Sequence, residues 1–199
     1  MSSSPLAIYR PRVLPKDIGV ALVVLMALTL GWLLMFQTQN RTRVFQEADD
    51  GIQVRYPATW HSVDSLQDLL IKLEDLQTAS AFKSTLSIER RDLDPSAPPT
   101  LQALLDRRME DRALLTGYHL LADSETNLDG ERALLLEYAY VVQPIDTPRR
   151  ASLPVVVHAR DYLVIARDRA YIISMAAPAD IFSLANPIFT RVAATIQLP

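Results

Sequence analysis

One long apolar run near the start of the chain contains no charged residue. From Ile18 to Phe36 the sequence reads IGVALVVLMALTLGWLLMF, and a helix of that length extends for about 28 Å, which matches the hydrocarbon core of a bilayer. We therefore predict a transmembrane helix over residues 18–36, after an N-terminal tail over residues 1–17. The positions expected to anchor it are Ile18, Leu22, Leu25, Leu28, Trp32 and Phe36.

The residues beside this run indicate how it is used. A secretory signal peptide is the competing interpretation, but its apolar stretch is usually about 7 to 15 residues long. The segment after Phe36 also lacks the small residues that a signal peptidase recognises. Three basic residues precede the run and two follow it, so the positive-inside rule predicts a cytoplasmic N-terminus. We expect a single-pass protein of the cell inner (plasma) membrane whose C-terminal domain is periplasmic or otherwise extracytoplasmic.

Residues 37–50 are predicted to form a juxtamembrane linker, and residues 51–199 a single extracytoplasmic domain. The linker ends in Asp49 and Asp50. Two interpretations of these acidic residues stay open: they keep the linker in water, or they contact a basic partner.

Within the domain, apolar and polar residues alternate in several segments, as they do in half-buried strands. Five leucines from Leu66 to Leu76 instead repeat at helical spacing and predict an amphipathic helix. Thr100 is expected to cap a second helix over residues 101–115, with Arg107 and Arg108 on its solvated face. A last helical region follows Pro178 and reaches Ala194. The expected strands are residues 51–56, 82–90, 118–121, 132–142, 155–165 and 171–175.

This order of elements predicts an α+β fold. The domain is expected to contain a mainly antiparallel sheet covered by helices, because the later strands follow one another through short turns. One of these turns, Asp129-Gly130, is a strong hairpin signal.

Composition and motifs exclude several functions. The chain has no cysteine, which removes disulfides, thiol catalysis and iron–sulfur ligation. Beyond Arg43, 15 basic residues face 22 acidic ones, a net charge of −7, so we expect no nucleic acid partner. No phosphate-binding glycine loop occurs, which argues against a nucleotide. His61, His119 and His158 lie far apart without metal-ligand spacing. We predict no catalytic residue, no metal and no cofactor.

Tyr56 and Trp60 form an aromatic group near the start of the domain. Core packing is the interpretation that we favour for Trp60. Docking to a partner is the alternative, and it extends to Tyr56, Asp49 and Asp50.

Three segments of the chain resemble the PsbP-like family, over roughly residues 51–198. They are GIQVRYPATW from Gly51, LDGERA from Leu128 and YIISMAAP from Tyr171. The resemblance implies an α/β/α sandwich, as a membrane-anchored bacterial member. It also implies a non-catalytic accessory subunit that docks on the integral subunits of a larger membrane complex and stabilises it. Energy-transducing respiratory or photosynthetic assemblies, such as alternative complex III, are the expected hosts. The alternative is a membrane-anchored binding module for a lipid or a small apolar ligand.

Overall fold

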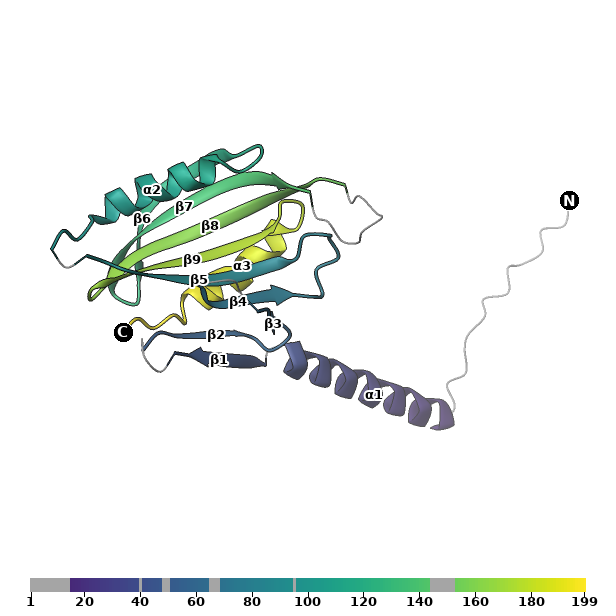
Figure 1. The fold of residues 1–199 in the computed structure, drawn as a ribbon. Helices are drawn as coiled ribbons and strands as arrows, with labels where there is room; N and C mark the ends of the chain where they lie inside the picture. The colour runs from purple at the N-terminus through teal and green to yellow at the C-terminus, as the bar shows by residue number, and fades with distance from the viewer. Residues whose placement is uncertain (1–14, 40, 48–50, 65–68, 95, 144–152) are drawn as a thin grey trace, which may run out of the picture. The chain divides into compact units, whose positions relative to one another are not determined.

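The structure is a computed structural model that describes residues 15–39, 41–47, 51–64, 69–94, 96–143 and 153–199. The chain divides into two compact units, Met1–Arg41 and Thr42–Pro199. The first unit contains one helix and the second contains the folded domain (Figure 1).

Helix α1 runs from Pro15 to Gln39. Its segment Ile18–Gln37 has a mean hydropathy of 2.5, and none of that segment is buried. The six predicted anchor side chains are exposed, and the rings of Trp32 and Phe36 stack one turn apart with centroids separated by 5.8 Å. The expected span lies within α1, whose length and hydropathy suit a membrane-crossing helix.

The domain consists of two sheets and two helices. A two-stranded sheet pairs β1 with β2, and a seven-stranded sheet has the order β3-β4-β5-β9-β8-β7-β6. Every pairing is antiparallel, as the short turns predicted. The strands are β1 Thr42–Gln46, β2 Gln53–Pro57, β3 His61–Ser62, β4 Leu69–Asp75, β5 Ser84–Asp92, β6 His119–Leu128, β7 Glu131–Val142, β8 Val155–Ala166 and β9 Arg169–Pro178, and the helices are α2 Leu101–Ala113 and α3 Phe182–Ala193.

The large sheet lies between two layers, so the domain is an α/β/α sandwich (Figure 1). Helix α2 packs on one face through Leu104 and Leu105, which join a cluster of buried side chains from β7, β8 and β9. Helix α3 and the β1–β2 hairpin cover the other face, where Phe189, Ile52 and Val54 are fully buried. The apolar positions of β7, β8 and β9 alternate between these two clusters, which is the physical basis of the sandwich.

Two tight turns close hairpins of the large sheet, and the sequence predicted the one at Asp129-Gly130. Asp129 and Gly130 have φ of 51° and 87°, which are the positive values of a type I′ turn. The side chain of Asn127 accepts a hydrogen bond from the Gly130 amide at 2.8 Å. Residues 167–168 turn β8 into β9, so this hairpin is longer and its turn is tighter than expected.

The helix predicted over Leu66 to Leu76 is wrong, because residues 69–75 form strand β4. Ile71 and Leu73 are buried, and Lys72 and Glu74 alternate with them. The segment therefore fits the two-residue period of a strand as well as the helical spacing of its leucines. Pairing with β5 decides between the two readings, since it satisfies the backbone of β4 and buries Ile71 and Leu73 together.

Part of the predicted linker 37–50 also has regular structure. Helix α1 continues to Gln39, and β1 pairs with β2 from Thr42, opposite Pro57, to Gln46, opposite Gln53. Asp49 and Asp50 lie outside the described residues, as does the tail before Pro15.

Candidate functional site

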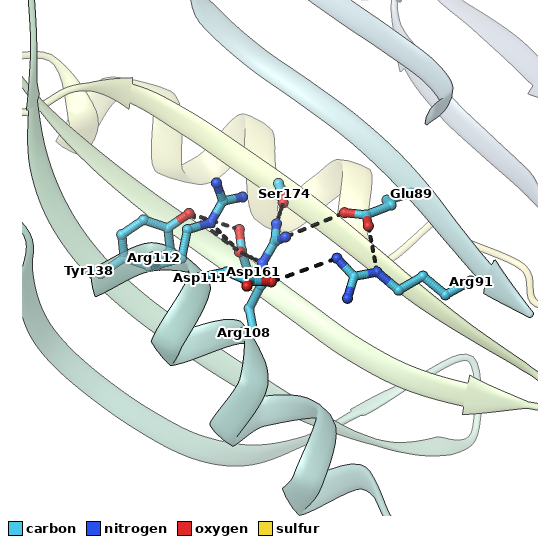
Figure 2. Close-up of polar contacts among 8 residues, drawn as sticks. All are labelled: Glu89, Arg91, Arg108, Asp111, Arg112, Tyr138, Asp161 and Ser174. Atoms are coloured by element: carbon cyan, nitrogen blue, oxygen red, sulfur yellow. Dashed lines mark hydrogen bonds and ion pairs between the residues drawn. The ribbon is translucent and has the colours of Figure 1, made fainter. Parts of the chain in front are cut away.

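A network of charged side chains lies between α2 and the large sheet (Figure 2). Thr100 caps α2 as predicted, because its hydroxyl accepts a hydrogen bond from the Ala103 amide at 3.1 Å. Arg108 then follows Leu104 by one turn and so shares its buried face. The prediction that Arg108 lies on a solvated face is therefore wrong, because Arg108 is only 6% exposed.

Asp161 is the centre of the network and is fully buried on β8. Along β8, Asp161 lies between Ala159 and Leu163 on the side that faces α2. Both neighbours belong to the apolar cluster that packs against α2. Arg108 Nε donates to the Asp161 carboxylate at 2.6 Å, and Arg112 Nε does so at 3.3 Å. A buried carboxylate is costly unless it is paired, and here two guanidinium groups from successive turns of α2 pair with it.

The remaining nitrogens of Arg108 also have partners. Nη2 donates to the Ser174 hydroxyl at 2.9 Å, and Nη1 donates to the Glu89 carboxylate at 3.3 Å. The guanidinium group thus joins α2 to β5, β8 and β9. Each hydrogen bond restricts the orientation of the Arg108 guanidinium group. The network therefore determines how α2 lies across the strands.

Tyr138 of β7 completes the inner part of the network. Its hydroxyl lies 3.3 Å from both carboxylate oxygens of Asp161. Burial raises the pKa of this hydroxyl, and the neighbouring Asp161 carboxylate raises that pKa further. The hydroxyl therefore stays protonated and donates to Asp161. The guanidinium carbon of Arg112 also lies 5.6 Å from the centre of the Tyr138 ring, in cation–π range.

The network reaches the surface through Glu89, Arg91 and Asp111 (Figure 2). Arg91 Nε lies 2.6 Å from a Glu89 oxygen, and its Nη2 lies 3.8 Å from Asp111 Oδ2. These residues line a cleft of about 640 Å³ between α2 and the ends of β4 and β5. Among the described residues, its lining consists of Leu69, Leu70, Glu89, Arg90, Arg91, Asp92, Arg107 and Asp111.

Arg107 differs from the other charged groups of this cleft. It is exposed on α2, one residue before Arg108, and within the described part of the chain it forms no ion pair. The cleft thus contains ion pairs between arginine and carboxylate side chains. It also contains Arg107, which is available to bind an incoming carboxylate. An arrangement of this kind suits recognition of a charged protein segment.

The three histidines lie in three different strands. His61 in β3 and His119 in β6 are exposed. His158 lies on the α3 face, where its ring stacks on Phe182 at 3.6 Å and its Nε2 is 3.6 Å from Glu137 Oε2. Among the described residues, no three side chains of the metal-ligating types come together.

The residues proposed for docking have different positions. Trp60 is only 2% exposed and packs edge to face on Phe189, with ring centroids 6.1 Å apart; this is the core role that the sequence favoured for it over docking. Tyr56 is half-buried, and its docking role stays a prediction. Neither residue belongs to the charged cleft.

Sequence reasoning missed the network, although one signal was present. Asp161 interrupts a strand that is otherwise rich in valine, leucine and alanine, and a carboxylate at an inward position needs a buried partner. The spacing of Leu104, Arg108 and Arg112 would have provided two candidates on one helix face.

Comparison with known proteins shows the fold. No protein-family model matches the sequence, and no curated protein matches it. Solved structures do match. Cyanobacterial PsbP (CyanoP) from Synechocystis sp. PCC 6803 aligns with a TM-score of 0.60 and 16% identity, over 79% of this chain and 92% of that one.

LpqN, which is involved in cell envelope biogenesis of Mycobacterium tuberculosis, is a second match. It aligns with a TM-score of 0.58 and 12% identity, over 80% of this chain and 91% of LpqN. At these identities the likeness concerns the fold alone. The domain has the PsbP-like α+β fold that the sequence segments predicted.

Proposed function

We propose that the chain is a non-catalytic, single-span accessory subunit that docks on a larger membrane complex. The observation that carries this proposal is α1: it is 25 residues long, its apolar segment has no buried part, and it precedes a folded domain without a long linker. Helix α1 acts as a signal anchor with its N-terminus in the cytoplasm. The domain lies on the extracytoplasmic side.

The charged cleft is the proposed docking surface of the domain. Its buried side is rigid, because Arg108 and Asp161 hold α2 against the sheet. Its open side carries Arg107 together with the Arg91 and Asp111 pair. A partner segment whose carboxylates and cations are complementary to these groups would form ion pairs with them. The cleft would therefore bind such a segment in preference to an uncharged one.

An energy-transducing assembly is the proposed host, either respiratory, such as alternative complex III, or photosynthetic. The support is the fold likeness to a cyanobacterial PsbP protein, and a fold likeness is an analogy rather than evidence of a site. The integral subunits of the host would supply its redox cofactors, and this chain would hold none. A lipid-binding or apolar-ligand module fits less well, because six of the eight described residues that line the cleft are charged.

The test is isolation of the full chain through a C-terminal affinity tag. Membranes of the source organism are solubilised in mild detergent, and the complex is separated on a native gel and identified by mass spectrometry. We expect stoichiometric co-migration with integral membrane subunits that hold redox cofactors. A monomer without partners would refute the accessory role, and a co-migrating complex without cofactors would refute the proposed host.

A charge reversal in the cleft tests the docking surface. Arg107→Glu replaces the available cation with a carboxylate, so we expect co-migration to be lost or strongly reduced. Arg191→Glu is the matched control, because Arg191 is also an exposed helical arginine but lies on α3, on the other face of the sheet. Equal yields of complex from the two variants would place the docking surface elsewhere.

A further inference from the structure

Exposed apolar side chains gather at one end of the domain. This end, which we call the apolar end, is where β4, β7 and β9 finish and where β5 and β8 begin. Figure 1 shows it as the end at which β1 starts. Among the described residues outside α1, all the exposed large apolar side chains except Val44 are found there: Leu76, Leu114, Leu121, Leu153, Val156 and Leu184.

The opposite end of the domain is polar. It contains the turns Asp129-Gly130 and Arg167-Asp168 and the loop around Asp94 and Ser96, all of them exposed. No exposed large apolar side chain of the described residues lies at those turns. Single apolar residues on a surface are ordinary. Their concentration at one end, with a polar opposite end, is what requires an explanation.

The apolar end is also where the chain enters the domain. Thr42, the first residue of β1, pairs with Pro57, and the Pro57 carbonyl accepts a hydrogen bond from the Trp60 amide. His61 then pairs with Glu74, and β4 finishes at Asp75, directly before Leu76. These successive pairings place Thr42 at the same end of the domain as Leu76.

The connection from α1 to Thr42 is short. The apolar segment of α1 ends at Gln37, the helix ends at Gln39, and two residues separate Gln39 from Thr42. A helical residue rises 1.5 Å and an extended one at most about 3.6 Å, so Thr42 lies within about 14 Å of the end of the span. The headgroup region on each side of a bilayer is only about 5 to 8 Å thick.

We propose that the apolar end is a lipid-contacting surface, which seats the domain on the membrane with its apolar side chains in the interfacial region. This inference depends on the proposed role of α1 as an anchor. Leu153 and Leu184 are 84% and 74% exposed, and such side chains lose contact with water when they enter the boundary between headgroups and acyl chains. Exposed Arg41 and Arg43, on either side of Thr42, suit anionic headgroups at the same level.

The absence of cysteine makes a direct test possible. Single cysteines are introduced as Leu153→Cys and Leu184→Cys and labelled with an environment-sensitive fluorophore in the full chain. The two matched controls are Asp168→Cys at the polar end and Leu28→Cys in α1. Each labelled protein is reconstituted into vesicles of phosphatidylethanolamine and phosphatidylglycerol, with and without brominated acyl chains that quench the fluorophore.

We expect blue-shifted and quenched emission from the labels at 28, 153 and 184, and water-like, unquenched emission from the label at 168. If the labels at 153 and 184 behave like the one at 168 while the label at 28 is quenched, the lipid-contacting surface is refuted and the anchor stands. An unquenched label at 28 would refute the anchor and, with it, this inference. Labels at 153 and 184 that are shielded in native membranes but not in lipid vesicles would assign the apolar end to a protein partner.

Discussion

Asp161 carries a charge in the interior of the domain, where it has no exposed surface and depends on Arg108 and Arg112. Such a pair has two different energetic roles. Its net contribution relative to apolar residues is small, because both groups lose their hydration, whereas removal of one partner leaves the other charge buried and unpaired. The two roles can be separated by mutation.

Asp161→Leu is expected to lower the free energy of unfolding by about 3–5 kcal/mol, because Arg108 keeps its charge without the carboxylate. The double variant Asp161→Leu with Arg108→Met should recover a large part of this loss. Chemical denaturation of the detergent-solubilised chain, followed by the change in tryptophan emission as the buried Trp60 becomes exposed, measures both values. Glu125→Ala is the control, since its ion pair with Arg132 is exposed and should contribute less than about 1 kcal/mol. A double variant as unstable as the single one would contradict this account.

His158 gives the domain a pH dependence of a defined sign. Burial lowers the pKa of its imidazole; the Glu137 carboxylate opposes this shift, and the Arg160 guanidinium adds to it. Below a pH of about 6.5 the unfolded chain binds a proton at this position that the folded chain resists. Stability should therefore fall as the pH is lowered from about 7 towards the pKa of the folded state.

His158→Gln should remove this contribution and make stability less dependent on pH between about 7.5 and 5.5. The measurement is the urea midpoint of unfolding at each pH. His61→Gln and His119→Gln are controls at exposed positions. An unchanged slope in the His158 variant would show that other groups cause the pH dependence.

At this scale the sequence predicted less than it could have. Leu104 and Leu105 are buried. The charge of Arg108 suggested a solvated position, although its spacing from Leu104 places it on the same buried face. The residue type predicted that Arg108 is exposed and its position in the helix predicted that it is buried. The position gave the correct result. The cleft itself could not be predicted, because Glu89, Arg107 and Asp111 meet only through the packing of α2 on the sheet.

At the scale of elements, segments with one clear periodicity were predicted well. Strands β5, β7, β8 and β9 are each nine or more residues long, and the sequence placed a strand in every one of these segments. Residues 69–75 are short and contain both periods, and the pairing with β5 decides between them. Strand β1 was missed because TRVFQ offers only five residues and becomes a strand through its pairing with β2.

Two glycines with positive φ provide a matched test of what the turns require. Gly117, before β6, has φ +64°, and an added Cβ would lie 3.0 Å from Val141 Cγ2; Gly130 has φ +87°, and nothing lies within 4 Å of an added Cβ. Each glycine-to-alanine change should cost about 1–2 kcal/mol through the backbone. Gly117→Ala should cost more, because Val141 must also move. Thermal unfolding of the two variants compares them, and a larger loss at Gly130 would contradict this reasoning.

At the scale of the whole molecule, the sequence predicted one apolar helix followed by one α+β domain, and the PsbP-like fold is confirmed by comparison with solved structures. The strand order could not be predicted. It depends on β5 pairing with β9 although residues 93–168 separate them in the chain, and alternation identifies strands without identifying their neighbours.

The orientation of the anchor is a prediction at the same scale. Ser4→Cys and Asp168→Cys are treated in intact cells or spheroplasts with a maleimide reagent that does not cross membranes. We expect labelling of the cysteine at 168 only, because the basic residues before α1 favour the cytoplasm. The labelled chain should also keep its full length, since a cleaved signal sequence would shorten it. Labelling at position 4 alone would reverse the topology.

The last residues of the domain are attached far from where the chain enters it. Gln197 exchanges backbone hydrogen bonds with Gln53, and the Leu198 amide donates to the Asp129 side chain at 2.8 Å, at the polar end. Any polypeptide that continues beyond Pro199, whether a fluorescent reporter or an affinity handle, leaves the domain on the side opposite Thr42. Fusions at this terminus therefore leave the apolar end unobstructed. If that end contacts lipid as proposed, the distance of a fused reporter from the bilayer measures the height of the domain above the membrane.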